Sequence, residues 1–161
     1  MDVFYYWKDY KNDIENDMVG RFVSTSKKLE EMNQCPPDYI WAFKTPEGRK
    51  GQVQLIARLW WAKTEPQGLK PSEKINIGSV MYYQPSDPRS ILYNNTDSDE
   101  AITHVTELLK TKFPAAFRSN FHGENGVHAL DSNFLTTFYK EIAQYSGTQF
   151  RSAVARVLLS K

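Results

Sequence analysis

Alternating side chains mark one long β-hairpin in the middle of the chain, between Asp38 and Lys63. Its first arm is aromatic at every second position, and its second arm is apolar at every odd position. These positions are Tyr39, Trp41 and Phe43, followed by Val53, Leu55, Ala57, Leu59 and Trp61. A period of two over this length predicts strands, and the Pro and Gly residues between the arms predict a turn. We therefore expect the odd face of the second arm to be buried and its even face, with Gln54, Arg58 and Trp60, to form a groove wall.

Shorter apolar runs and helical patterns fill the rest of the chain. Further strands are predicted at 3–7, 74–84, 90–93 and 127–130. Helices are predicted at 27–32, 100–112, 132–146 and about 148–160, with a loop at 117–126. Gly78 is expected at a bulge or at a bend of the sheet. One of the three hydroxyls from Ser24 to Ser26 is expected to cap the helix that follows them.

These elements predict one α+β domain over all 161 residues, with the helix at about 148–160 as an addition. We expect the strands at 3–7, 38–45, 51–62 and 74–84 to form one curved sheet. The expected architecture is a mixed, largely closed β-barrel of about five or six strands with helices at its periphery.

The composition limits the classes of protein to which this chain can belong. Cys35 is the single cysteine, which excludes an internal disulfide and a cysteine-based metal site. No apolar run approaches the roughly 20 residues of a membrane span, and the first residues do not resemble a signal peptide. We therefore expect a cytoplasmic protein that contacts no membrane.

Charge and aromatic content favour a binding surface. The net charge is +1, but the first twenty residues and the segment 94–100 are acidic, so the remainder is basic. A basic remainder permits a nucleic-acid face. Aromatic residues make up 14% of the chain, which supplies rings for a core and for a stacking pocket.

Several of these segments occur in an order that resembles a known family. An aromatic strand, VFYYW, precedes the run FVSTSKKLEEMNQCPPDYIWAF at 22–43, then GQVQLIARLWW and GVHALDSNFLTTFYKEI. This order is similar to that of PUA-like domains, and most similar to their EVE branch, over residues 3–145. The YTH and ASCH branches share the superfold. The usual Gly-Asp before the aromatic strand is replaced here by Pro37-Asp38.

The resemblance implies a module that takes an extruded, usually modified, nucleobase of DNA or RNA into a pocket at the barrel mouth. It implies service in a modification-dependent restriction or RNA-related system, with a partner nuclease and without a cofactor. Matched position by position, the base-binding residues are Trp7, Lys8, Asp9, Ser24, Thr25, Ser26, Trp41 and Phe43. For Trp41 the alternative is a place in the core, and for one of the hydroxyls it is the helix cap.

Basic residues near these segments are candidates for binding phosphate. A first group, chosen because its members cluster in the sequence, is Arg21, Lys27, Lys28, Arg49 and Lys50. A second candidate is Arg58 on the even face of the hairpin, paired with the aromatic residue Trp60.

Two other classes of function stay open. An ASCH-like amidohydrolase would use a Lys, Thr and Glu set, of which Thr25 and Lys27 match a part, but no glutamate stands at a comparable place. A protein-interaction module would use the aromatic surface to bind a partner chain. The spacing of His122, Glu124 and His128 fits no metal site, so none is predicted.

Overall fold

The first strand of the protein, β1 (Asp2–Tyr6), is paired on both sides. In the computed structural model, which describes residues 1–160 apart from the side chains of Asn76 and Ile77, β1 lies between two neighbours. It pairs in parallel with β3 (Tyr39–Lys44) and antiparallel with β7 (Val127–Leu130). The hairpin extends the sheet, because β3 pairs antiparallel with β4 (Gln54–Ala62).

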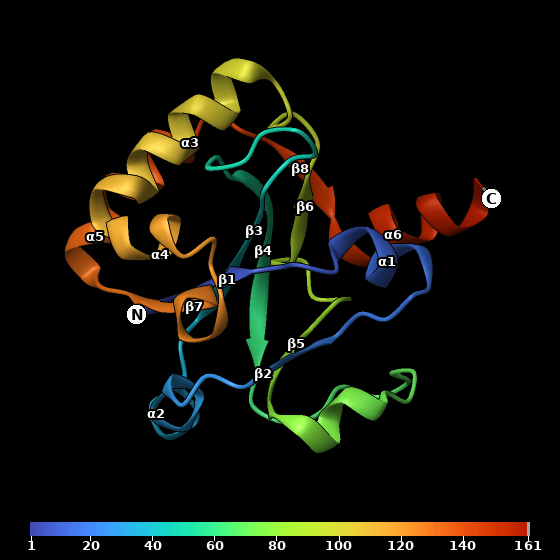
Figure 1. Cartoon of the computed structure of the whole chain (residues 1–161). Coiled ribbons are helices and arrows are strands. Elements are labelled where there is room, and N and C mark those ends of the chain that lie inside the picture. The colour runs from blue at the N-terminus through green and yellow to red at the C-terminus, as the bar shows by residue number, and fades with distance from the viewer. Residues whose placement is uncertain (161) are drawn as a thin grey trace.

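The sheet then curls back over β1. Its order is β2-β5-β4-β3-β1-β7, with two short strands, β6 and β8, branching from β4. The bounds of these further strands are β2 (Arg21–Ser24), β5 (Ser79–Tyr83), β6 (Ile91–Tyr93) and β8 (Gly147–Gln149). The described chain is thus α+β, with a curled mixed sheet that forms a half-barrel and several helices around it (Figure 1).

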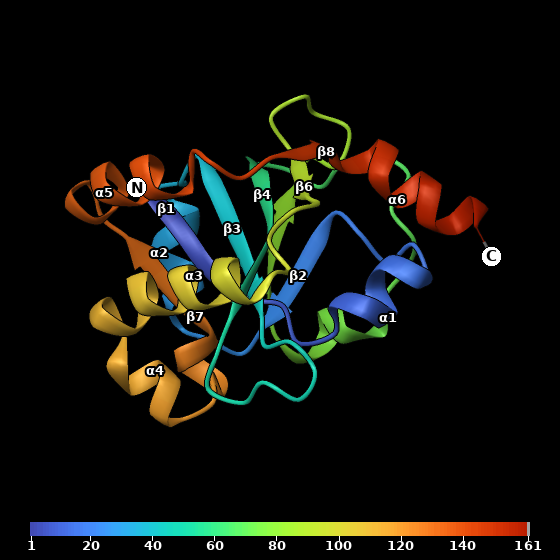
Figure 2. The ribbon, with the colours of Figure 1, turned by 90° about the horizontal axis from the view of Figure 1, so that it is seen from above.

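Helices cover the sheet on two sides (Figures 1 and 2). One side carries α3 (Asp99–Lys112), α4 (Pro114–Arg118) and α5 (Ser132–Ile142). The other side carries α1 (Tyr10–Glu15), α2 (Lys28–Gln34) and α6 (Phe150–Leu159). Two short 3-10 helices, η1 (Glu73–Ile77) and η2 (Gly123–Gly126), lie in the connections.

A β-bulge in the hairpin divides the interior into two cores. Ala42 faces Ala57 and Phe43 faces Leu55, so Ile56 is an extra residue on β4. Because side chains alternate along a strand, the extra residue moves every later odd position to the other face. The odd positions of β4 are all buried, but the expectation that they form one buried face is wrong.

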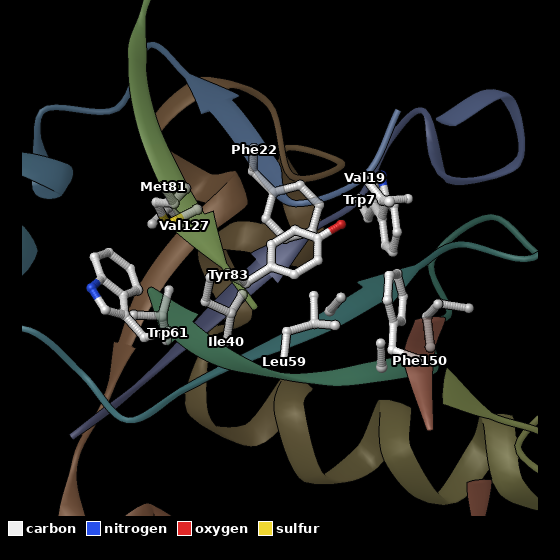
Figure 3. Close-up of a cluster of buried hydrophobic side chains, with 14 of the residues drawn as sticks. Trp7, Val19, Phe22, Ile40, Leu59, Trp61, Met81, Tyr83, Val127 and Phe150 are labelled. Carbon is white, nitrogen blue, oxygen red and sulfur yellow. The ribbon is translucent and has the colours of Figure 1, made fainter. Parts of the chain in front are cut away.

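The barrel core lies inside the curl of the sheet, and Figure 3 shows many of its members. It includes Val3, Trp7, Phe22, Ile40, Ala57, Leu59, Trp61, Tyr83 and Phe150. The helix-side core lies between the sheet and α3, α4 and α5. It includes Phe4, Trp41, Phe43, Val53, Leu55, Leu109 and Phe138.

Three local expectations need correction. The predicted strand at 74–84 begins only at Ser79, because Ser72 accepts a hydrogen bond from the amide of Lys74 and starts η1 instead. The strands β2 and β8 were not predicted, since each is short and lacks clear alternation. Gly78 lies between η1 and β5, where a Cβ atom would stand 2.7 Å from the carbonyl oxygen of Ser24, so the close approach to β2 requires glycine.

A buried carboxylate joins the start of β1 to the helix-side core. Asp2 accepts hydrogen bonds from Trp41 Nε1 and from the Tyr139 hydroxyl, both at 2.8 Å, and from the amide of Tyr39 at 3.3 Å. Asp2 is only 2% exposed, so water cannot replace these contacts. The buried indole N–H of Trp41 therefore depends on this one acceptor.

We expect Asp2→Ala to lower the free energy of unfolding by about 2 kcal/mol, because it leaves the buried N–H of Trp41 without an acceptor. Urea unfolding of the two proteins measures this difference. The matched control is Asp97→Ala, which removes an exposed carboxylate and should change stability by less than about 0.5 kcal/mol. Equal effects of the two substitutions would contradict the role given to Asp2.

Candidate functional site

The half-barrel is open between its two edge strands, β2 and β7, which stand at opposite ends of the sheet order and do not pair. At this opening β2 also comes beside the end of β1 without backbone pairing. The ring of Tyr5, on β1, stacks on Phe22, on β2, with 4.1 Å between centroids. Aromatic packing therefore holds the two strands together where backbone pairing stops, and two hollows adjoin this contact.

The first hollow, called the inner hollow here, has a volume of about 300 Å³. Its floor is formed by Tyr5 and Trp7, and its rim by residues of α1, β2 and the start of η1. The remaining lining residues are Lys8, Asp9, Asn12, Asp13, Met18, Arg21, Phe22, Val23, Ser72 and Lys74. Rings at the floor and polar groups at the rim are the arrangement of a small-molecule site.

Trp7 fixes the floor of the inner hollow and belongs at the same time to the barrel core. It is 1% exposed, and its ring meets Phe22 edge-on at 5.0 Å. Its Nε1 donates a hydrogen bond to Asp13 at 2.8 Å. Tyr5 is less buried than Trp7, and its ring stacks on Phe22, so what is left of its exposed surface, rather than that of Trp7, can contact a ligand.

A carboxylate is held in this hollow against the cost of burial. Burial raises the pKa of Asp13, while the hydrogen bond from Trp7 and the charge of Lys74 act in the opposite direction. At the rim, Lys74 Nζ pairs with Asp9 at 2.9 Å, and this contact raises the pKa of Lys74. The hollow therefore presents a hydrogen-bond acceptor, Asp13, beside the Trp7 indole, and a cation, Lys74, at its rim.

The outer hollow, of about 400 Å³, adjoins the inner one and shares Tyr5, Lys8, Asp9 and Val23 with it. Its further lining residues are Tyr6, Ser24, Thr25, Asn120, Phe121, His122, Gly123, Gly126 and Val127. Asn120 and Phe121 have φ values of 53° and 60°, in the left-handed region that side chains rarely adopt. The Phe121 ring stacks on Tyr6 at 4.7 Å with an interplanar angle of 1°, which offsets the backbone strain.

Glu124 joins β2 to β7 across the opening. Its carboxylate accepts hydrogen bonds from the Ser26 hydroxyl and the Lys27 amide, both at 2.7 Å. The hydrogen bond from Ser26, the Lys27 amide and the nearby lysines lower the pKa of Glu124. A carboxylate that is kept ionised by these hydrogen bonds holds Ser26 and Lys27 in position and is a poor proton donor near neutral pH.

The start of α2 differs from the expected hydroxyl cap. The N-cap position is Lys27, which makes no side-chain cap. The Ser26 hydroxyl accepts from the Lys28 amide at 3.2 Å and donates to Glu124, while Ser24 accepts from the Ser26 amide. Ser26 is 2% exposed, so it supports the loop, whereas Ser24 and Thr25 line the outer hollow.

The structure brings together most of the predicted base-binding residues but separates two of them. Trp7, Lys8, Asp9, Ser24 and Thr25 line the two hollows. Trp41 and Phe43 are fully buried in the helix-side core, on the other face of the sheet. Their place follows from the alternation on β3, which directs Ile40 and Ala42 into the barrel core.

The predicted phosphate-binding residues are scattered. Arg21 is buried and donates to the carbonyl of Lys70, and Lys28 donates to the carbonyls of Glu124 and Val127. Arg49 pairs with Asp99. Lys27 and Lys50 are exposed.

Arg58 and Trp60 lie toward the far end of the hairpin from the hollows. The Arg58 guanidinium stands over the Tyr39 ring at 4.8 Å, and that of Arg89 stands over Trp60 at 3.4 Å. Arg89 is in turn paired with Asp87 at 2.8 Å. These residues form a separate aromatic and cationic surface with its own carboxylate.

Sequence reasoning missed several residues of the hollows. Tyr5 and Tyr6 were treated as strand residues only, although their position at the end of an aromatic strand was a usable signal. Asn12, Asp13, Lys74 and Asn120 come from distant segments, and no local pattern marks them.

A second polar cluster lies between α3 and α5. His104 bonds the Tyr145 hydroxyl through Nδ1 at 2.6 Å and Glu141 through Nε2 at 2.9 Å. The order resembles a nucleophile, a base and an orienting acid, but burial and the charges of Glu100 and Glu141 raise the pKa of Tyr145. An activated nucleophile needs the opposite shift, so this cluster serves to join the two helices.

Within residues 1–160, no group of three or more His, Cys, Asp or Glu side chains is placed to hold a metal ion. None of the helices in that range has the length and apolar character needed to cross a membrane.

The sequence matches no protein-family model, and comparisons with curated proteins and with solved structures found no match either. Function must therefore be argued from the two hollows themselves.

We expect Asp13→Asn to increase the stability of the folded protein at neutral pH. Burial raises the folded-state pKa of Asp13 above its ordinary value of 3.8, so the wild-type protein loses stability as pH rises from 3.8 through that pKa. Asparagine keeps an oxygen for the Trp7 N–H but carries no charge to desolvate.

Urea unfolding at pH 7 and at pH values below 3.8 checks this prediction. The gain should be present at neutral pH and disappear in acid, where Asp13 is protonated in both states. Asp97→Asn is the control for an exposed acid and should show neither effect. If Asp13→Asn instead lowers stability at pH 7, the ionised carboxylate stabilises the fold, and this prediction is wrong.

Proposed function

We propose that the protein binds nucleic acid and takes one extruded, modified nucleobase into the inner hollow. The observation that carries this proposal is a hollow of about 300 Å³ with the Tyr5 ring over its floor and the Asp13 carboxylate beside it. This volume is at the lower end of the range for small-molecule sites, which suits a single base.

Each wall of the inner hollow has a role in this proposal. A base that lies on Tyr5 gains stacking energy on the order of 1–3 kcal/mol. Asp13 can only accept when ionised, so it favours a base that presents an amino group or a ring N–H at that edge. Lys8 and Lys74 at the rim attract the phosphates that flank the base.

The finer fold assignment is part of the same proposal. We propose that the half-barrel is a PUA-like domain of the EVE branch, because the order of aromatic strand, basic loop, aromatic hairpin and closing strand is similar. Its opening then corresponds to the mouth where that family receives a base, and a nuclease would act as the partner.

We expect Tyr5→Leu to weaken binding of an oligonucleotide with one modified base by about 1–3 kcal/mol, because leucine fills the space without a stacking face. Fluorescence anisotropy with strands that carry one methylated cytosine or adenine, and with their unmodified counterparts, measures the change. The matched control is Tyr82→Leu, on a half-buried tyrosine that lines neither hollow.

Thermal unfolding must accompany this comparison, because Tyr5 also packs on Phe22. If Tyr5→Leu stays folded and binds as the wild-type protein does, the inner hollow is not the base site. If modified and unmodified strands bind equally well throughout the panel, the reader hypothesis fails, and a protein-interaction module becomes the better account.

We expect the double substitution Lys8→Ala and Lys74→Ala to reduce the slope of log affinity against log salt. On a single strand the reduction should be about 0.7 for each phosphate that the protein no longer neutralises. The control pair is Lys110→Ala and Lys140→Ala, which removes the same charge from exposed positions on α3 and α5. Equal slopes for the two double variants would place the phosphates elsewhere.

A further inference from the structure

A third hollow continues the site beyond the two described above. It has a volume of about 380 Å³ and lies between the end of β1 and the turn that joins β3 to β4. It shares Tyr6, Asn120 and Phe121 with the outer hollow, which in turn shares Tyr5 and Lys8 with the inner hollow. The three hollows therefore form one groove, which runs from Lys74 at the inner end to Lys50 at the far end. The segments that border it lie on the same side of the sheet in Figure 2.

Positive side chains stand at both ends of this groove. The inner hollow is lined by three cations and by both carboxylates of the groove, Asp9 and Asp13, and only Asp9 of these acids also lines the outer hollow. The described lining of the third hollow contains no acid, and its one cation is Lys50, which is exposed. A polyanion whose base enters the inner hollow can therefore meet a cation at each end of the groove, Lys74 at the inner end and Lys50 at the far end.

The partition between the outer and third hollows is an aromatic pair with a polar tip. Tyr6 and Phe121 stack in parallel, and Asn120, at φ 53°, is exposed beside them. Half-exposed Tyr6 offers apolar ring surface, and the amide of Asn120 offers both a donor and acceptors. Rings spaced between cations are the usual surface for a single-stranded nucleic acid.

We propose that this groove holds a single-stranded segment of about three nucleotides, one for each hollow, whose backbone leaves the inner hollow toward Lys50. The inference rests on the proposed function and specifies its substrate class, since neighbouring bases can enter hollows only when they are unpaired. In a duplex the flanking bases stay paired inside the helix and cannot occupy the outer and third hollows.

Anisotropy titrations of the whole protein with labelled probes of increasing length test this path. The probes are a nucleoside monophosphate with a methylated base, a trinucleotide and a hexanucleotide with that base at one end, each as DNA and as RNA, and a duplex form of the hexanucleotide. We expect affinity to rise at least about tenfold from the monophosphate to the trinucleotide, little further to the hexanucleotide, and to fall for the duplex.

Lys50→Ala supplies the decisive variant, with Lys110→Ala as the matched control. We expect Lys50→Ala to weaken trinucleotide binding several-fold and to lower its salt slope by about 0.7, while monophosphate binding is unchanged. Normal trinucleotide binding by Lys50→Ala, or duplex binding as tight as single-strand binding, overturns the proposed path but leaves the base site standing. Failure of every probe to bind overturns both proposals, and the DNA and RNA arms identify the sugar that the groove accepts.

Discussion

The requirement that one sheet be buried on both faces shapes the rest of this protein. Helices α3, α4 and α5 cover one face, and the curl of the sheet together with α1, α2 and α6 covers the other, so β3 and β4 must present apolar side chains in both directions. On β4 the extra residue Ile56 changes which face the odd positions occupy, so that these positions contribute to both cores. The bulge also bends the strand, which helps the sheet curl toward β5 and β2 without closing.

The functional proposal depends on the hollows that remain beside β1 and β2 because the sheet does not close. Backbone pairing is replaced there by the contact of Tyr5 with Phe22 and by the bridge from Ser26 to Glu124. Side chains leave hollows where paired strands would not, and polar groups can line those hollows. Asp13 is the residue that most favours a binding role for the inner hollow. Burial raises its pKa, and a neutral residue at this position would give a more stable fold.

Sequence periodicity was sufficient for the long elements and for part of the site. The alternation at 38–63 identifies the hairpin because the segment is long enough to show a period of two, and the uninterrupted aromatic run at 3–7 identifies β1. The bulge at Ile56 was not predictable, since an apolar residue there fits either face. Trp7, Lys8, Ser24 and Thr25 were found because they lie beside recognisable segments, whereas Asp13 and Asn120 reach the hollows only through tertiary packing.

The most direct test of the base site uses the indole N–H signals of the four tryptophans in an NMR titration with a modified oligonucleotide. Trp7 donates to Asp13 in the inner hollow, whereas Trp41 donates to Asp2 in the helix-side core. The account predicts that the Trp7 signal shifts in proportion to bound ligand while the Trp41 signal stays in place. A shift confined to Trp60, beside Arg89 on the separate aromatic surface, with Trp7 unmoved, would contradict it.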